Sequence, residues 1–357
     1  MEGLGRLMFQ RDFFQEKRVF LTGHTGFKGS WMCELLLLCG AKVTGFALEP
    51  PTDPALFDLM GIDKDICSIT GDIRDLSRLE KAVQQADPQI VIHMAAQPIV
   101  RDSYNDPVYT YETNVMGTVN VLESMRSVGS VRSFLNVTTD KVYKNNEWEW
   151  GYREADELNG YDPYSNSKSC SELVTDSYKK SFFRDTCTAI STARAGNVIG
   201  GGDFANDRII PDCVRAAMQN KEIVVRNPYS TRPYQHVLEP LCAYLTIAQA
   251  QYEDRTCEGS YNIGPDYADC VTTGELATLF CNAWDGIGWT DCSEENAVHE
   301  ANFLKLDCSR VKSVFGVAPK WNVKKAIEKT VEWSKCWQAG GDVEECMKKQ
   351  ILEYLEG

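Results

Sequence analysis

A tyrosine and a lysine four residues apart, Tyr164 and Lys168, form the pair with the clearest chemical use in this sequence. On a helix, residues at this spacing face the same side. A nearby ammonium favours the phenolate and lowers the pKa of a tyrosine from its usual value of about 10. Such a tyrosine can take the proton of a sugar or alcohol hydroxyl. An ordinary exposed pair of helix residues has the same spacing, so the interpretation depends on the surrounding residues.

A polar segment, Thr138-Thr139-Asp140-Lys141, follows an apolar run upstream of that pair. Such a polar strand end, with a glycine-rich loop further upstream, favours an active site over a chance occurrence of the tyrosine–lysine spacing.

A glycine-rich loop, Thr-Gly-His-Thr-Gly-Phe-Lys-Gly at 22–29, lies between an apolar run and a helical pattern. Glycines at this spacing let backbone amides and a helix N-terminus approach a pyrophosphate closely. Because the loop joins a strand to a helix, it favours a dinucleotide site over a plain tight turn. No arginine follows the second strand to meet a 2′-phosphate, which favours NAD over NADP, although Lys28 weakens that preference slightly.

Two further strand ends extend the predicted cofactor site. Gly71-Asp72-Ile73 follows a short strand-like run, where Asp72 is placed to accept from an adenine amino group unless it lies in a surface turn. Residues 93–97 end another strand in small side chains, as a cofactor close to the backbone requires. The residues expected to contact NAD are Gly23, Thr25, Gly26, Phe27, Gly29, Asp72, Ile73, Ala95, Ala96, Gln97, Tyr164 and Lys168.

The elements that position these groups can be predicted from the hydrophobic pattern. Apolar runs alternate with helical patterns, which indicates a parallel sheet covered by helices on both faces. The expected strands are 18–21, 42–47, 89–94, 133–137 and 188–194, and the expected helices are 30–39, 77–86, 108–127 and 163–183. We expect a Rossmann-type doubly wound parallel sheet in residues 1–190, with residues 235–265 packing back onto it. A smaller mixed α/β lobe in residues 191–357 would bind the substrate.

Composition narrows the class of protein. The chain has 357 residues and a formal net charge of −14, which argues against nucleic-acid and membrane-surface binding. No apolar run reaches the ~18 residues of a membrane span, and residues 1–17 lack a secretory apolar core. The fourteen cysteines include no Cys-x-x-Cys pair. We therefore predict no metal site and reduced, mostly buried cysteines in a cytoplasmic protein.

Several stretches resemble a known family. The glycine loop and the Tyr164/Lys168 pair are similar to those of the extended short-chain dehydrogenase/reductases that act on nucleotide sugars. The stretches HMAAQPIVRDSY (93–104), EWEWGYRE (147–154) and RNPYSTRPYQHVLEP (226–240) are more specific, and they resemble the branch of that family that dehydrates CDP-glucose. The similarity extends from about residue 15 to about residue 310.

The resemblance implies a reaction with CDP-glucose as substrate. Tyr164 would remove the O4 proton while NAD takes hydride from C4, with Thr139 bonded to the same oxygen and Lys168 holding the nicotinamide ribose. Water would then be eliminated across C5 and C6, and hydride would return to C6. Related dTDP-glucose enzymes carry Asp-Glu where this chain has Asp140-Lys141. The resemblance assigns the elimination to this pair without deciding which is the base. Lys141 would be the base if Lys168 and the nicotinamide cation depressed its pKa, and Asp140, with a raised pKa, would donate to the leaving hydroxyl. The alternative is a structural ion pair between Asp140 and Lys141.

The resemblance also implies contacts to the substrate. Asn197 matches a diphosphate-contacting asparagine of the family, and Arg232 matches an arginine that clamps the pyrophosphate, for which a planar guanidinium is suited. Arg101 and Arg208 are further candidates. His236 either orients the site or is a core histidine.

The family pairs two helices with a second subunit. The helices expected at 108–127 and 163–183 therefore imply a homodimer through a four-helix bundle, unless their apolar faces are internal core.

A locally positive cleft is expected on the acidic protein. Lysines and arginines would line it and acids would lie on the surface: Lys168, Arg194, Arg208 and Arg232 in the cleft, and Glu294, Glu295, Glu344 and Glu345 outside it.

Two other interpretations stay open. A nucleotide-sugar 4-epimerase, or a dehydratase for another nucleotide, would share most of these residues, although an epimerase has no need of Asp140 and Lys141. A non-catalytic NAD-sensing protein on the same fold would typically lack the tyrosine or the lysine, and both are present.

Overall fold

The computed structural model describes residues 9–293 and 304–357, so Glu294 and Glu295 lie outside the described residues. The elements, in chain order, are α1 (Arg11–Phe14), β1 (Arg18–Thr22), α2 (Phe27–Leu38), β2 (Lys42–Ala47), α3 (Leu56–Met60), η1 (Ile62–Lys64), β3 (Cys67–Thr70), α4 (Leu76–Ala86), β4 (Ile90–His93), α5 (Val100–Asn105), α6 (Pro107–Tyr111), η2 (Glu112–Met116), α7 (Gly117–Arg126), β5 (Ser133–Thr139), η3 (Asp140–Val142), α8 (Pro163–Phe182), β6 (Ala189–Ala195), β7 (Val198–Ile199), α9 (Ile209–Met218), β8 (Ile223–Val225), β9 (Thr231–Pro233), β10 (Gln235–His236), α10 (Leu238–Glu253), η4 (Arg255–Cys257), β11 (Ser260–Ile263), η5 (Tyr267–Asp269), β12 (Cys270–Thr272), α11 (Thr273–Trp284), β13 (Trp289–Asp291), α12 (Ser309–Phe315), α13 (Val323–Gln338) and α14 (Val343–Glu356).

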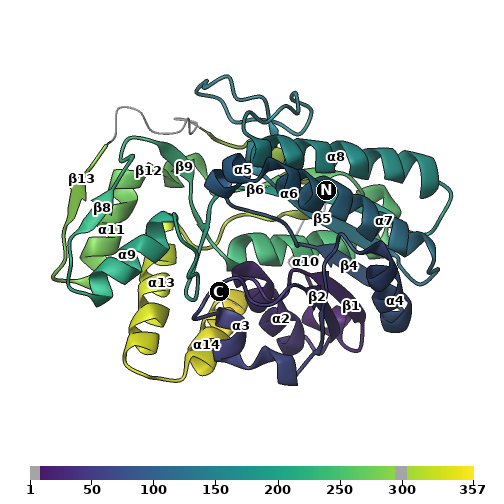
Figure 1. Ribbon diagram of the computed structural model, residues 1–357, viewed down its shortest axis with the longest axis horizontal. Helices are drawn as coiled ribbons and strands as arrows, with labels where there is room; N and C mark the ends of the chain where they lie inside the picture. The colour runs from purple at the N-terminus through teal and green to yellow at the C-terminus, as the bar shows by residue number, and fades with distance from the viewer. Residues whose placement is uncertain (1–8, 294–303) are drawn as a thin grey trace, which may run out of the picture.

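A seven-stranded parallel sheet in the order β11-β6-β5-β4-β1-β2-β3 forms the centre of the molecule. Helices α4, α7 and α8 cover one face, and α2 and α10 cover the other (Figure 1). The strand order reverses between β1 and β4, which is the switch point at which doubly wound sheets bind ligands. The sheet confirms the predicted Rossmann-type fold.

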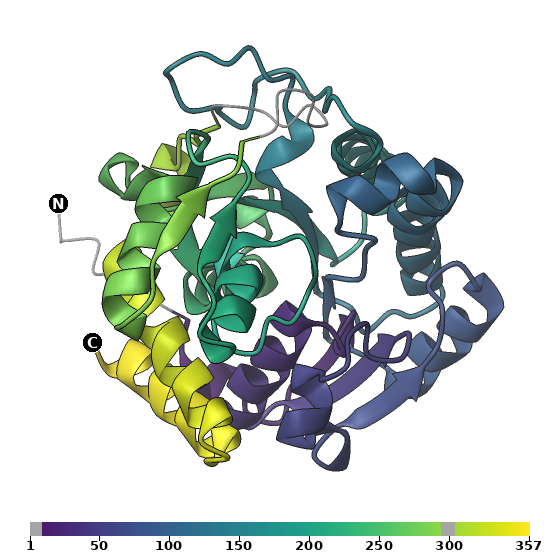
Figure 2. The same cartoon turned by 60° about the vertical axis from the view of Figure 1, so that its left-hand side comes forward.

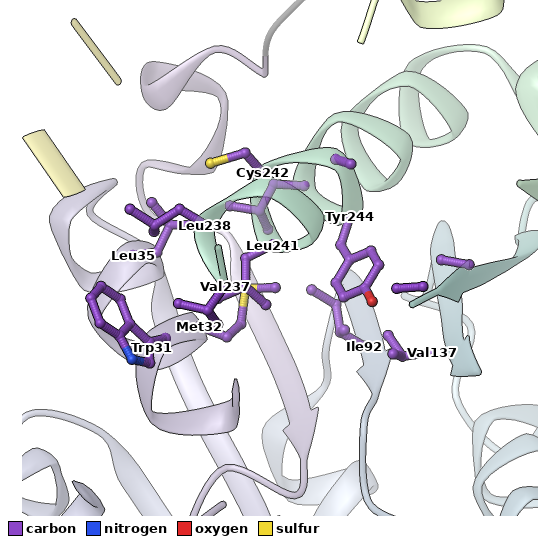
Figure 3. Close-up of a cluster of buried hydrophobic side chains, with 14 of the residues drawn as sticks. Trp31, Met32, Leu35, Ile92, Val137, Val237, Leu238, Leu241, Cys242 and Tyr244 are labelled. Atoms are coloured by element: carbon purple, nitrogen blue, oxygen red, sulfur yellow. The ribbon is translucent and has the colours of Figure 1, made fainter. Parts of the chain in front are cut away.

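The alternation of side chains along each strand explains why both faces are covered. In β1, Phe20 packs into the cluster beneath α4 and α7, while Val19 and Leu21 pack into the cluster on the opposite face. Because both sets are apolar, the strand is stable only with helices on both sides. In the close-up of Figure 3, Trp31, Met32 and Leu35 of α2 lie beside α10 residues, and Tyr244 of α10 lies close to Ile92 and Val137. This packing fixes the sheet beneath the strand ends.

Residues after β6 form a second group of elements. Three two-stranded sheets, β10-β7, β12-β9 and β13-β8, lie with α9, α11 and α13 to one side of the large sheet (Figures 1 and 2). They enclose a separate apolar cluster that includes Ile210, Phe280 and Ile327. Helix α10 and strand β11 belong to the large sheet and its cover instead. A boundary at residue 190 would cut β6, so we propose that the two parts divide after Ala195.

The helix expected at 108–127 is not regular throughout. It begins at Pro107 and contains a π-helical turn, η2, between α6 and α7. Within that turn, the Asn114 side chain exchanges hydrogen bonds with the Gln97 backbone, at 2.8 and 3.0 Å, and donates to Ser167 Oγ at 2.9 Å. Such turns change which side chains point inward, and this one ties the loop after β4 to α8.

Other expectations concern membrane spans, cysteines and surface charge. Within the described ranges, no helix has both the length and the apolar character of a bilayer span. All fourteen cysteines are free thiols, as predicted, but only five are buried: Cys33, Cys39, Cys213, Cys242 and Cys308. The expectation that most are core residues is therefore wrong. Glu345 is exposed and Glu344 half-buried.

Candidate active site

A cavity of about 620 Å³ opens beyond the carboxyl ends of β5 and β6. Segments of α9, β8 and β9 form its other wall, so both parts of the chain contribute to it. Many of the predicted site residues line it together: Phe27, Arg101, Thr139, Asp140, Lys141, Tyr164, Asn197, Arg208 and Arg232.

The side chains at the end of β5 form a continuous hydrogen-bonded chain. Thr139 hydrogen-bonds Tyr164 and donates from Oγ1 to Asp140 Oδ1 at 2.9 Å. Lys141 Nζ donates to the same Oδ1 at 3.3 Å and to Asn197 Oδ1 at 3.4 Å. Asp140 is fully buried, and its Oδ2 has no hydrogen-bond partner among the described residues. The chain connects a phenol, a carboxylate and an ammonium along one wall of the cavity.

Helix α8 brings Tyr164 to that wall, while Lys168 is buried behind the lining. The helix begins at Pro163, a residue suited to its first position, and Asp162 caps it by accepting from the Ser165 amide at 2.9 Å. Tyr164 therefore lies in the first turn and Lys168 one turn later. Lys168 Nζ donates to the Val137 carbonyl of β5 at 3.3 Å, which holds the helix face against the catalytic strand end.

The expectation that Lys168 depresses the pKa of Tyr164 is wrong for this structure. Burial is the main cause that raises the pKa of Tyr164 to about 12, and the hydrogen bond with Thr139 opposes it only in part. The pKa of Lys168 is lowered to about 7, chiefly by burial and also by the nearby Lys28. Since burial disfavours both charged forms, the proton of Tyr164 needs an acceptor, and the bond to Thr139 leads to Asp140.

The glycine loop has the backbone shape that a dinucleotide needs. Gly23 has φ +77°, and a Cβ there would lie 2.8 Å from the Ala95 backbone nitrogen. A Cβ at Gly29 would lie 2.1 Å from the Gly23 oxygen. Helix α2 begins directly after Gly26 without a side-chain cap, so its first amides are left for a ligand. Residues of the loop therefore fit the pyrophosphate of NAD.

The other predicted cofactor residues lie outside the lining of the cavity. The Asp72 carboxylate forms an ion pair with Arg74 at 2.7 Å. The Gln97 side-chain amide donates to Thr110 Oγ1 at 2.9 Å and to the Ile99 carbonyl at 3.1 Å. Contacts from these two side chains to NAD stay predictions, as do those of Thr25, Ile73, Ala95 and Ala96.

The predicted substrate arginines face the cavity, but acids pair with two of them. Arg208 bonds Asp203 at 3.1 Å, and Arg101 bonds Asp207 at 3.2 Å. Arg232 is buried in β9. The lining carries as many acidic as basic side chains: Lys28, Arg101, Lys141, Arg208, Arg226 and Arg232 against Asp140, Glu147, Asp162, Asp203, Asp207 and Asp212. The expected positive cleft is thus formally balanced, although it is less acidic than the protein as a whole.

Two residues that sequence reasoning placed at the cleft are elsewhere. His236 is buried between Trp31 and Trp321, with ring centroids 5.6 and 4.9 Å away, and it does not line the cavity. It is the core histidine that the sequence left as an alternative. Arg194 is also buried, in an ion pair with Glu172 at 2.8 Å, because its position in β6 points it beneath α8.

Lys28 is a site residue that sequence reasoning missed. It lines the cavity beside the catalytic residues. Its pKa is lowered to about 8, because burial and the charge of Arg208 outweigh the opposing charge of Asp140. Its place in the glycine loop indicated only a cofactor contact. Nothing in the spacing indicates that the first turn of α2 directs it toward Asp140.

The Rossmann-type sheet, the glycine loop and the Tyr164/Lys168 helix together define an extended short-chain dehydrogenase/reductase. A family model described as GDP-mannose 4,6 dehydratase matches residues 20–330. The chain belongs to this family of NAD-dependent nucleotide-sugar 4,6-dehydratases.

Individual relatives agree with the family assignment. A CDP-glucose 4,6-dehydratase from Salmonella typhimurium is 46% identical over 98% of this chain and 99% of its own length. A dTDP-glucose 4,6-dehydratase from Streptomyces antibioticus is 26% identical over 88% of this chain and 91% of its own. Among solved structures, a dTDP-glucose 4,6-dehydratase from Streptomyces venezuelae with NAD bound has a TM-score of 0.76 at 21% identity, covering 90% of this chain and 98% of its own. That likeness concerns the fold.

Proposed function

We propose that this protein is an NAD-dependent CDP-glucose 4,6-dehydratase that forms CDP-4-keto-6-deoxyglucose and water. The observation that carries the proposal is the hydrogen-bonded chain from Tyr164 through Thr139 and Asp140 to Lys141. It supplies a proton acceptor for the sugar O4 and, within the same wall, an acid and a base for elimination. The 46% identity to the Salmonella enzyme supports CDP-glucose as the substrate.

The first half of the reaction uses the α8 pair. Tyr164 takes the O4 proton as its own proton passes through the Thr139 hydroxyl to Asp140, and Thr139 also bonds the sugar O4. Lys168 Nζ, held against the Val137 carbonyl, supplies an ammonium suited to bind the nicotinamide ribose. NAD, when bound in the glycine loop, supplies the acceptor for the C4 hydride and its return to C6.

The second half uses Asp140 and Lys141. A ketone at C4 acidifies the proton on C5, so a base of moderate strength can remove it. Lys141 and Asp140 share a hydrogen bond at 3.3 Å, which lets one member take the C5 proton while the other protonates the departing C6 hydroxyl. A 4-epimerase performs no elimination and has no use for this pair, so the pair favours the dehydratase.

Charged side chains on both walls of the cavity support binding of the diphosphate. Arg232 and Arg208 present guanidinium groups, and Asn197 presents its amide beside Lys141. Arg208 and Arg101 must exchange their carboxylate partners for phosphate oxygens. This exchange keeps each charge paired in the bound state.

Incubation with CDP-, dTDP-, GDP- and UDP-glucose in turn tests the substrate. The expected product is CDP-hexose lighter by one water, detected by mass spectrometry, with the other three nucleotides turned over much more slowly. Loss of water from dTDP- or GDP-glucose alone would reject CDP-glucose while keeping a dehydratase.

A homodimer through α6, η2, α7 and α8 forms part of the proposal. Val108, Met116 and Leu173 on these elements are 66, 51 and 56% exposed. A Tyr111–Asn166 hydrogen bond at 3.0 Å joins α6 to α8 beside them. Exposed apolar side chains grouped on adjacent helices are typical of a subunit interface. A second copy of this chain would cover them in a four-helix bundle.

A further inference from the structure

A buried carboxylate lies one helical turn beyond Lys168. Glu172 is 3% exposed. Its Oε2 accepts from Arg194 Nη2 at 2.8 Å and from Thr192 Oγ1 at 2.7 Å, and its Oε1 accepts from Thr138 Oγ1 at 2.5 Å. Burying an ion pair removes both charges from water, so such a pair is weak support for stability by itself. Because Glu172 lies next to the active site, the buried carboxylate can instead serve the reaction.

The contacts of Glu172 lead directly to the reacting groups. Thr138 precedes Thr139, the hydroxyl that bonds both Asp140 and Tyr164. Along α8, Tyr164, Lys168 and Glu172 follow one another at four-residue spacing and so face the same side. One carboxylate therefore meets both the catalytic strand end and the catalytic helix face.

We propose that Glu172 is a positioning residue of this active site, which keeps Lys168 in its ammonium form and fixes the strand end that presents Thr139. The proposal rests on the proposed function only for the catalytic roles of Lys168 and Thr139. The effect of the Glu172 charge on the ionisation of Lys168 can be measured in the protein without substrate.

The electrostatics around Lys168 support this role. Burial and the charge of Lys28 in α2 lower the pKa of Lys168, Glu172 raises it, and the pKa that results is about 7. His93 of β4 also faces Lys168, but its pKa is lowered to about 3 by burial and then by Lys168, so it is neutral. Tyr164, one turn earlier, is a phenol with its pKa raised to about 12 by burial. Among these groups, Glu172 supplies the negative charge.

Other contacts hold α8 in place independently of Glu172. Asn136 of β5 donates to Ser171 Oγ at 3.0 Å and to Thr175 Oγ1 at 2.8 Å. Asn114 donates to Ser167 Oγ at 2.9 Å. Loss of the Glu172 charge should therefore leave the helix in register and alter mainly the ionisation of Lys168.

The test measures the ionisation of Lys168 in the full-length protein without substrate. Lysine is labelled with ¹³C, the Cε shift is followed against pH, and the Lys168 signal is identified by its loss in Lys168→Met. Wild type should titrate near pH 7. In Glu172→Gln the midpoint should fall by about one pH unit or more, and Glu172→Asp should restore most of it. The pH above which kcat declines should move down by the same amount, because activity needs the ammonium.

Arg194→Gln is the matched control, since it breaks the same ion pair but keeps the carboxylate. Its Lys168 midpoint should stay at or above the wild-type value, although its stability falls as in Glu172→Gln. Should Glu172→Gln fail to fold, the double variant Glu172→Gln/Arg194→Gln removes both buried charges and should still show the lower midpoint. An unchanged midpoint in Glu172→Gln or in the double variant, or an equal decrease in Arg194→Gln, would overturn the proposal. The midpoint from the ¹³C titration is measured without substrate, so it does not depend on which nucleotide sugar the protein turns over.

Discussion

The chemistry of single residues in this site is governed by burial. Tyr164 and Lys168 are both enclosed, so each is pushed toward its neutral form. Asp140, beneath them, keeps one carboxylate oxygen without a hydrogen-bond partner in the described structure. The proposed proton path therefore runs through Thr139 and Asp140 rather than depending on a pre-formed phenolate. Lys141, at the far end of this path, is where oxidation and elimination can be separated by mutation.

Lys141→Met should lower kcat roughly 10²–10⁴-fold, the usual contribution of a general acid or base. The proposed hydride step at C4 does not use Lys141, so reduced cofactor should accumulate on mixing with CDP-glucose and be visible in its absorbance. Lys144→Met is the control, because Lys144 is an exposed lysine three residues away that pairs with Glu157. Full dehydratase activity in Lys141→Met would reject the assigned role.

Buried histidines should make the fold sensitive to acid. Burial lowers the pKa of His24 to about 4 and those of His93 and His236 to about 3. Because these values lie below the unfolded value of about 6.5, stability is fully present above about pH 6.5 and is lost as pH falls toward 3. Each histidine contributes a loss of about 2 kcal/mol between pH 6.5 and 5.

His236→Asn tests this linkage through urea unfolding at pH 7 and pH 5. The variant should be less stable at both values, since it loses contacts with two tryptophans. The decrease between pH 7 and 5 should nevertheless be smaller than in wild type, by about 2 kcal/mol. An identical decrease in both proteins would show that His236 does not contribute to the acid sensitivity.

At the scale of elements, the site depends on the ends of three elements. These are the glycine loop between β1 and α2, the end of β5 at Thr139, and the capped start of α8. The π-turn η2 ties the loop after β4 to α8 through Asn114. These junctions meet at the carboxyl edge of one parallel sheet, so their relative positions are fixed by the pairing of strands.

Gly29→Ala should disable the cofactor loop, because the added Cβ would lie 2.1 Å from the Gly23 oxygen. The backbone would have to shift, at a cost of about 1–3 kcal/mol in unfolding free energy. Calorimetry should show NAD affinity reduced at least about tenfold, or by about 1.4 kcal/mol. Gly129→Ala, where the Cβ meets no atom within 4 Å, should leave both quantities unchanged. Normal NAD binding by Gly29→Ala would contradict the loop assignment.

Local patterns in the sequence were enough to predict strands β1, β2, β4, β5 and β6, the glycine loop and the Tyr164/Lys168 face. Each of these depends on residues within a few positions of one another. Lys28, Glu172 and Asn114 could not be found in this way, since their partners are distant in sequence and depend on the packing of α2, α8 and η2. The pKa of Tyr164 was mispredicted for the same reason, because spacing to Lys168 contains no information about burial.

The whole molecule combines an acidic surface with a charge-balanced cavity. A net charge of −14 coexists with basic and acidic side chains in equal number around the cavity. Ion pairs such as Arg101–Asp207 connect the large-sheet part to the group of elements after β6. A diphosphate with two negative charges can replace the carboxylates as the partner of the arginines. A nucleic acid could not, because the net negative charge of the protein would repel it.

The proposed dimer can be tested with one charge. Leu173→Glu places a carboxylate on the exposed apolar face of α8 and should convert the protein to a monomer in analytical ultracentrifugation, because an unpaired charge would be buried in the interface. Val314→Glu, at an exposed valine of α12, is the control and should leave the oligomeric state unchanged. A monomeric wild-type protein would reject the proposed bundle.

The path of the C4 hydrogen tests the central claim most directly. CDP-glucose carrying deuterium at C4 is incubated with the protein, and the product is examined by mass spectrometry and NMR. The account predicts loss of one water with the deuterium retained at C6, because the hydrogen removed from C4 is returned within the same active site. An unchanged mass with deuterium still at C4 would contradict it and would indicate an epimerase or a protein that does not act on this sugar.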